Sequence, residues 1–166
     1  MVNLKSQYQK LKVEIDTAIL STIGQSRFIG GAPVKSFEDE LSHYLDIPYV
    51  ISCANGTDAL QIALQAIGAV QGDEVIIPAF TYVATAEVIA LLGLTPVMVD
   101  VNLDTFNINI DQVRSAITEK TKAIIPVHLF GQSSDMTAIM NIAEQHNLYI
   151  IAVSYTHLTL PTILLV

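Results

Sequence analysis

The sequence predicts an α/β fold in which a mostly parallel sheet is flanked by helices. Short apolar segments alternate with longer segments of helical periodicity through most of the chain. The short segments are apolar throughout, which is typical of strands buried on both faces of a sheet. The chain has 166 residues, of which 51% are hydrophobic and 14% are charged. This composition indicates a globular domain with a substantial core.

Two helices are predicted before the alternation begins. From Leu4 to Ile23, apolar residues recur at spacings of three or four, as on one face of a helix. Residues 24–33 contain three glycines and a proline and are predicted to form a loop. A second amphipathic helix is expected over Val34–Leu45, directly after Pro33, a residue type that is common at helix starts.

The remaining elements alternate between strand and helix, which is the pattern of a parallel sheet. The strand candidates are Tyr49–Ser52, Glu74–Ile77, Pro96–Val99, Ala123–Val127 and Tyr149–Ile151. The helix candidates are Thr57–Ile67, Val83–Leu92, Ile110–Ile117 and Met136–His146.

The last residues depart from this alternation. Residues 145–166 contain no Asp, Glu, Lys or Arg, and no turn followed by a helix is recognisable after Ala152. We expect residues 1–152 to belong to the domain and residues 153–166 to be a non-native tail joined to an interrupted reading frame. A buried terminal strand is the alternative.

The charge balance and the cysteine count exclude several classes of protein. The formal net charge is −8 with only eight Lys and Arg, so we expect no nucleic acid partner. A single cysteine permits no disulfide within the chain, which fits a reducing compartment. The polar first residues lack the apolar core of a signal peptide, and no apolar run is long enough to span a bilayer. We therefore expect a cytoplasmic protein with no membrane association.

The most informative segment is Asn55-Gly56-Thr57-Asp58, which separates an apolar run from a helical pattern. A tight turn at this position would direct backbone N–H groups at one point, at the positive end of the helix dipole. Such a point binds phosphate. The alternative is an ordinary capped turn, because Asn, Thr and Asp are all favourable N-cap residues.

Three further segments accompany strand ends or glycines. Phe80 or Tyr82 follows a predicted strand, where an aromatic ring could stack on a flat cofactor or could belong to the core. His128 follows another strand and leads into a glycine turn, so it could line the site or serve as a structural histidine. The Gly30-Gly31 pair would allow close backbone approach to a ligand, or only a hinge between two helices.

In their order and spacing these segments resemble one family. The matching segments are Phe28–Gly31, Ser52–Gln61, Gly72–Tyr82, Thr95–Val101 and Ile124–Gln132. Together they are similar to the DegT/StrS family of sugar-nucleotide aminotransferases, which are fold-type I enzymes dependent on pyridoxal 5′-phosphate (PLP). The resemblance implies that residues 1–152 form part of the large domain of such an enzyme.

The resemblance also implies roles for individual residues. Gly56, Thr57 and Asp58 match the positions that hold the PLP phosphate, and Tyr82 matches the ring that stacks on the pyridine. His128 would lie near the edge of the cofactor. These five residues are the predicted cofactor-binding set.

The same resemblance implies the substrates and the assembly. Gly30 and Gly31 would border the sugar nucleotide, a UDP- or dTDP-linked keto sugar that receives an amino group from glutamate. The product would serve surface polysaccharide or amino-sugar synthesis, and the parent enzyme would be a homodimer. No metal site is expected.

Two parts that the family's chemistry requires are not found in the sequence. The family's aspartate at the pyridine nitrogen opens an Asp-x-Ala-Gln motif, but Ala152-Val153-Ser154-Tyr155 stands at that place. The Schiff-base lysine would come later, and Lys120 and Lys122 are expected to be solvated loop charges. No catalytic residue is therefore assigned, and we expect the chain as given to be an inactive fragment.

Two alternative functions stay open from the sequence. Some relatives of this fold use PLP to dehydrate a sugar, with a histidine in place of the lysine, and the deciding position is not present. A non-catalytic domain that binds PLP or another phosphate ligand is the second alternative.

Overall fold

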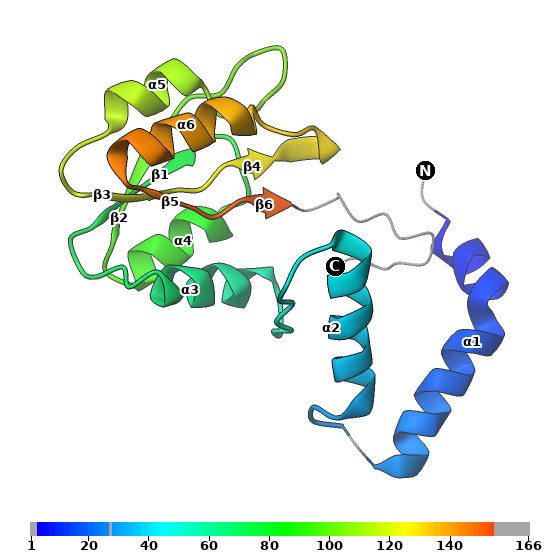
Figure 1. Cartoon of the computed structure of the whole chain (residues 1–166). Helices are drawn as coiled ribbons and strands as arrows, with labels where there is room; N and C mark the ends of the chain where they lie inside the picture. The colour runs from blue at the N-terminus through cyan, green and yellow to red at the C-terminus, as the bar shows by residue number, and fades with distance from the viewer. Residues whose placement is uncertain (1–2, 27, 155–166) are drawn as a thin grey trace. The chain divides into compact units, whose positions relative to one another are not determined.

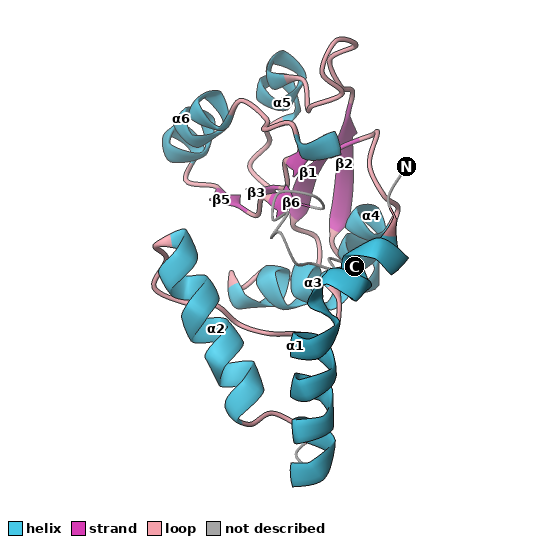
Figure 2. Cartoon of the chain, turned by 90° about the vertical axis from the view of Figure 1, so that its right-hand side faces the viewer, coloured by secondary structure: helices cyan, strands magenta, loops and turns pink. Residues whose placement is uncertain are grey.

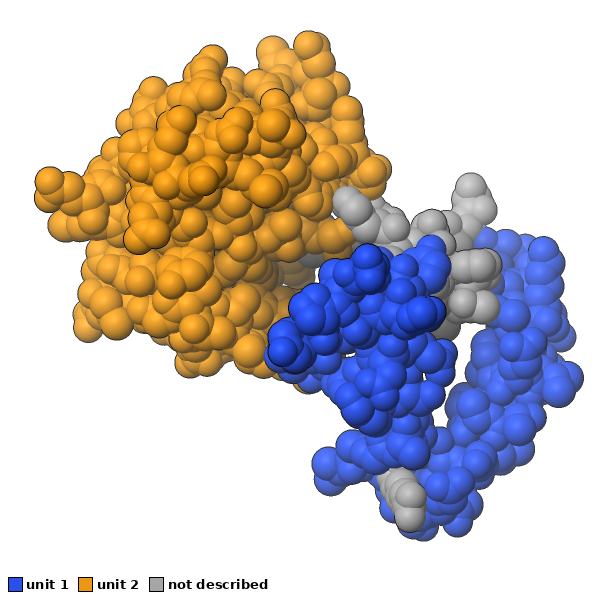
Figure 3. All heavy atoms as spheres, viewed as in Figure 1, with its two compact units in different colours: residues 1–53, 160–164 blue, residues 54–159, 165–166 orange. Residues whose placement is uncertain are grey.

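The computed structural model describes residues 3–26 and 28–154 (Figure 1). These residues form two compact units, 3–53 and 54–154 (Figure 3), which we describe separately. No helix in the described part of the chain is long and apolar enough to cross a membrane.

The first unit contains the two predicted helices, α1 (Leu4–Gln25) and α2 (Ala32–Leu45). The side-chain oxygen of Asn3 accepts a hydrogen bond from the Ser6 N–H at 3.0 Å and caps α1. On the surface of α1, Lys12 pairs with Asp16 and holds the pKa of that carboxyl below its usual value. Neither helix contains a buried residue.

The predicted strand Tyr49–Ser52 is wrong. The structure places no strand at these residues, and the side chains of Tyr49 and Ile51 are 82% and 79% exposed. The Ser52 N–H instead donates to Glu38 Oε1 at 3.0 Å. An apolar segment becomes a strand only when a neighbouring strand satisfies its backbone groups, and the described residues provide no such neighbour here.

The second unit is built on a four-stranded parallel sheet with the order β2-β1-β3-β5. Its strands are β1 (Glu74–Pro78), β2 (Thr95–Val99), β3 (Thr121–Ile124) and β5 (Tyr149–Ile150). A second parallel pair joins β4 (Val127–His128) to β6 (Val153–Ser154). The prediction of a mostly parallel sheet is thereby confirmed.

One predicted strand, Ala123–Val127, is divided in two. β3 ends at Ile124 and β4 begins at Val127, with Pro126 between them. Proline has no N–H and cannot donate to a neighbouring strand. The pairing still continues past the break, because the Val153 N–H donates to the Pro126 carbonyl at 2.9 Å.

The expected boundary at residue 153 falls within this second pair of strands. Val153 and Ser154, the first two residues of the predicted non-native tail, form β6 beside β4. The rest of that predicted segment, 155–166, lies outside the described residues.

Helices cover both faces of the sheet (Figures 1 and 2). One face is covered by α3 (Gly56–Ala66) and α4 (Ala84–Leu91), and the other by α5 (Ile110–Ala116) and α6 (Met136–His146). Each of these four helices, like α1 and α2, lies within two residues of its predicted bounds at either end.

Alternation along β1 separates two hydrophobic cores. Val75 and Ile77 pack in a cluster with Leu64 of α3 and Val88 of α4, whereas Ile76 packs in a cluster with residues of α5 and α6. The three side chains of β1 are at most 1% exposed. Because successive side chains of a strand point to opposite faces, a continuous apolar run fills both cores at once.

We expect the core between α3 and the sheet to dominate the stability of the second unit. Leu64→Ala should lower the free energy of unfolding by about 2–5 kcal/mol, because Leu64 is fully buried and its removal leaves a cavity. The matched variant Leu91→Ala, at a residue that is 70% exposed on α4, should change it by less than about 0.5 kcal/mol. Chemical denaturation followed by circular dichroism measures both, and equal losses would contradict this account of the core.

Candidate functional site

The helix start at Asn55 is the centre of the candidate site. Asn55 is extended (φ −165°, ψ 174°), and its side-chain oxygen accepts a hydrogen bond from the Asp58 N–H at 2.9 Å. Its side-chain nitrogen donates to Asp58 Oδ2 at 3.0 Å, which holds the Asn55 side chain in the capping position. This is the local outcome that an Asn three residues before an acidic residue predicts.

Gly56 and Thr57 open α3 directly after this cap. Backbone N–H groups at a helix start have no carbonyl of their own helix to bond, and they lie at the positive end of the helix dipole. A Cβ added at Gly56 would meet no atom within 4 Å, so the space in front of this residue is open. The end of α3 can therefore accept an anion.

A cavity of about 820 Å³ lies in front of this helix end. Its walls come from the start of α3, the segment from β1 into α4, the short 3-10 helix η1 (Leu129–Gly131), and residues 151–154, which lead from β5 through β6. All of these belong to the second unit. The lining residues are Asn55, Gly56, Thr57, Ala59, Leu60, Tyr82, Ala84, Leu129, Ile151, Ala152, Val153 and Ser154.

The structure brings three of the five predicted cofactor-binding residues to this cavity. Gly56, Thr57 and Tyr82 line it, although the first two open α3 and Tyr82 lies in the segment between β1 and α4. Asp58 does not line it; its N–H donates to Asn55 Oδ1, and its Oδ2 accepts from the Asn55 side-chain nitrogen. His128 does not line it either, whereas the next residue, Leu129, does.

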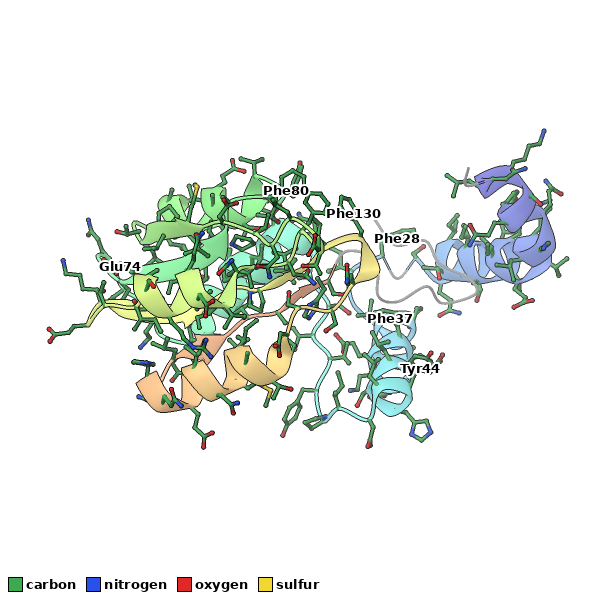
Figure 4. The ribbon with its side chains drawn as sticks, turned by 90° about the horizontal axis from the view of Figure 1, so that it is seen from above. Phe28, Phe37, Tyr44, Glu74, Phe80 and Phe130 are labelled. Atoms are coloured by element: carbon green, nitrogen blue, oxygen red, sulfur yellow. The ribbon has the colours of Figure 1, made fainter. Side chains whose placement is uncertain are left out.

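The structure separates the two aromatic candidates, Phe80 and Tyr82. Phe80 packs against Phe106 with ring centroids 5.4 Å apart, and Phe106 meets Phe130 edge-on at 6.3 Å. Figure 4 shows Phe80 and Phe130 together at one end of this unit, with Glu74 at the other end. Tyr82 is the ring that faces the cavity, and its side chain is 65% exposed.

Gly30 and Gly31 belong to the first unit. Their φ angles are 63° and 98°, which L side chains rarely adopt, and a Cβ on either would meet nothing within 4 Å. Gly31 lines a separate hollow with Ser26, Phe28 and Ile29. Within this unit the glycines are thus required by backbone conformation, and their contact with a ligand stays a prediction.

Several residues of the cavity were not predicted from the sequence. Asn55 could have been found from its N-cap preference, and residues 151–154 from their place after a parallel strand. Ala152, where the resemblance places an aspartate, lies in the cavity wall. Lys122, expected in a loop, lies in β3 with its Nζ 5.4 Å from the centroid of the Tyr149 ring.

No group of three or more His, Cys, Asp or Glu in the described part of the chain could hold a metal ion. The cavity instead combines an apolar wall, an aromatic ring and a helix N-terminus beyond the carboxyl ends of parallel strands. This arrangement suits a flat ligand that carries a phosphate.

The fold is that of part of the large domain of a fold-type I PLP-dependent transferase, which solved relatives share. A model of the DegT/DnrJ/EryC1/StrS aminotransferase family matches residues 9–154. The chain therefore belongs to that family, whose members are PLP-dependent aminotransferases.

Individual relatives agree with this assignment. The chain is 51% identical over 151 residues to the "Pleiotropic regulatory protein" of Geobacillus stearothermophilus, covering 91% of this chain and 41% of that protein. It is 47% identical over 150 residues to the UDP-2-acetamido-2-deoxy-3-oxo-D-glucuronate aminotransferase of Pseudomonas aeruginosa, covering 90% and 42%. The crystal structure of NtdA from Bacillus subtilis with bound cofactor PMP matches with a TM-score of 0.83 at 40% identity, covering 86% and 33%. The chain thus spans about 40% of the length of these two curated relatives.

The Asn55 cap should matter for ligand binding as well as for stability. Asn55→Ala should lower the free energy of unfolding by about 1 kcal/mol and weaken binding of PLP, because the first turn of α3 loses its cap. Asn109 caps α5 in the same way, accepting a hydrogen bond from the Gln112 N–H at 3.0 Å. Asn109→Ala is the matched control: it should cost similar stability and leave binding unchanged. Equal losses of PLP affinity in the two variants would argue against a site at α3.

Proposed function

We propose that this chain is the cofactor-phosphate-binding part of a PLP-dependent aminotransferase that acts on a keto sugar nucleotide. The amino donor would be glutamate, and the product would enter surface polysaccharide or amino-sugar synthesis. The observation that carries the proposal is the meeting of the α3 N-terminus and Tyr82 at one cavity. Family membership over residues 9–154 supports it.

The residues present fit a PLP phosphate. Gly56 and Thr57 would hold it through backbone N–H groups, and the open space in front of Gly56 lets an anion approach the helix end. Asp58 would act indirectly, because its N–H and carboxylate fix the Asn55 cap. Support of the turn is thus the role that the observed contacts give Asp58, and its place at the phosphate stays a prediction.

The cavity also fits the ring of the cofactor. Tyr82 offers an aromatic face, and the remaining wall is mainly apolar, so a flat ring would be shielded from water. Thr81 and Thr85, neighbours of the cavity residues Tyr82 and Ala84, each hold a buried hydroxyl without a hydrogen-bond partner among the described residues. When bound, PLP supplies the electron sink for moving an amino group.

The substrate class follows from the relatives. The Pseudomonas protein is named for a 3-oxo UDP-sugar, and it shares 47% identity with this chain. A keto sugar nucleotide is therefore the proposed amino acceptor, with Gly30 and Gly31 at its border. We further propose a homodimeric, cytoplasmic parent enzyme that binds neither nucleic acid nor membrane.

A regulatory role is the second candidate, favoured by the name of the Geobacillus relative. A regulator of this family would bind the cofactor or a sugar nucleotide without turnover. The cavity at α3 serves either role, so only the residues that carry out the chemistry distinguish the two.

Two glycine-to-alanine substitutions, one at the proposed phosphate site and one in α1, test the position of the phosphate. Gly56→Ala should weaken PLP binding about tenfold, because its methyl group would fill the space in which we place the phosphate. Gly24→Ala in α1 is matched, since its Cβ also meets nothing within 4 Å and its φ is not left-handed. Neither variant should lose stability, because alanine favours a helix over glycine. Equilibrium dialysis with PLP measures the difference, and full affinity in Gly56→Ala would refute the proposed phosphate position.

Sequencing the source gene past the codon for Ala152 tests two proposals together: the aminotransferase reaction and the boundary of the domain at residue 153. We expect the frame to continue into an Asp-x-Ala-Gln motif and to reach a lysine in a PLP-binding context. A histidine at the lysine position would instead indicate the sugar dehydratase. A confirmed natural end after Val153–Val166 would remove the aminotransferase proposal and leave the binding or regulatory role.

A further inference from the structure

The loop between β4 and α6 is held in an uncommon conformation. Phe130 and Gly131 have φ angles of 54° and 79°, so two consecutive residues are left-handed. For a bulky side chain this conformation is rare and persists only where surrounding contacts hold it. The loop matters because its first residue, Leu129, forms part of the cavity wall.

Buried polar contacts close this loop at its base. The Ser134 N–H donates to His128 Nδ1 at 3.0 Å, and the Ser134 hydroxyl donates to the Val127 carbonyl at 3.2 Å. His128 and Ser134 are only 8% and 4% exposed. A buried hydrogen bond of this kind is costly to break, because water cannot replace the lost partner.

Phe106 and Asn107, which lie between β2 and α5, contact the loop between β4 and α6. Asn107 is 6% exposed, and its side-chain nitrogen donates to the Ser133 carbonyl at 2.9 Å. The residue before it, Phe106, meets Phe130 edge-on. Phe130 is thus held by its contact with Phe106 in addition to the hydrogen bonds at the base of its loop.

The hydrogen bond from Ser134 also determines which ring nitrogen of His128 carries the hydrogen. A nitrogen that accepts a hydrogen bond from an N–H must offer a lone pair, so Nδ1 carries no hydrogen and the ring proton is on Nε2. A hydrogen on Nδ1 would face the hydrogen of the Ser134 amide. Closure of the loop therefore depends on one particular ring nitrogen.

We propose that His128 is a positioning residue, which holds the 129–134 loop through its Nδ1 and so sets Leu129 in the wall of the cofactor cavity. The place near the edge of the cofactor that the resemblance implies for His128 stays a prediction beside this positioning role. The identity of the ligand in the cavity rests on the function proposed above. The hydrogen bond between Ser134 and His128 does not depend on that proposal.

Two variants of His128 distinguish the role of Nδ1 from that of Nε2. In His128→Asn the side-chain oxygen can occupy the place of Nδ1, whereas in His128→Gln the polar group reaches the place of Nε2. Hydrogen exchange of the Ser134 amide reports the contact, and exchange of the Ile125 amide, which donates to the Ile76 carbonyl at 2.8 Å, reports the sheet as a control.

We expect His128→Asn to keep the Ser134 amide protected and to keep PLP affinity close to that of the unmodified chain. His128→Gln should speed exchange of that amide about tenfold or more, and should weaken PLP binding, with Ile125 unchanged. Protection retained in His128→Gln but lost in His128→Asn would overturn the proposal.

A measurement on the unmodified chain decides the matter even where a variant fails to fold. The nitrogen chemical shifts of the His128 ring should show a hydrogen on Nε2 and none on Nδ1, and the opposite assignment would overturn the proposal. Both the shifts and the amide exchange are read without ligand. If the unmodified chain binds no PLP, the proposed function fails while the loop contact is still judged.

Discussion

The burial of β1 on both faces is the constraint on which the second unit depends. Val75, Ile76 and Ile77 are almost completely shielded from solvent, and β1 pairs with β2 on one side and β3 on the other. Helices must then cover both faces, since an apolar strand cannot leave either one exposed to water. The carboxyl ends of the strands are left uncovered, and the cavity opens there.

The candidate site combines weak local features that gain their meaning from position. A capped helix start is common, and so is an aromatic residue after a strand. Their meeting at one apolar cavity turns two ordinary features into a candidate phosphate and ring site. The residues that do not touch the cavity support those that do: Asp58 secures the cap, and His128 closes the loop that carries Leu129.

Much of the fold could be predicted because the spacing of apolar residues within a segment indicates whether that segment is a helix or a strand. Apolar spacing located the six α-helices of the described residues to within two residues at each end. Two strand predictions failed, each for its own reason. Tyr49–Ser52 has the composition of a strand but no partner among the described residues, and Ala123–Val127 is divided at Pro126, where the ladder loses a donor.

The sequence by itself determined the tight turn at residues 55–58, the helix that follows it, and the order of motifs that places the chain in its family. These depend on residues close together in the chain, whose propensities and hydrogen bonds are local. Only the tertiary structure decided that Tyr82 faces the cavity while Phe80 packs on Phe106, and that His128 bonds to Ser134. Such choices depend on which distant segments meet, because a side chain turns toward the partners that packing brings to it.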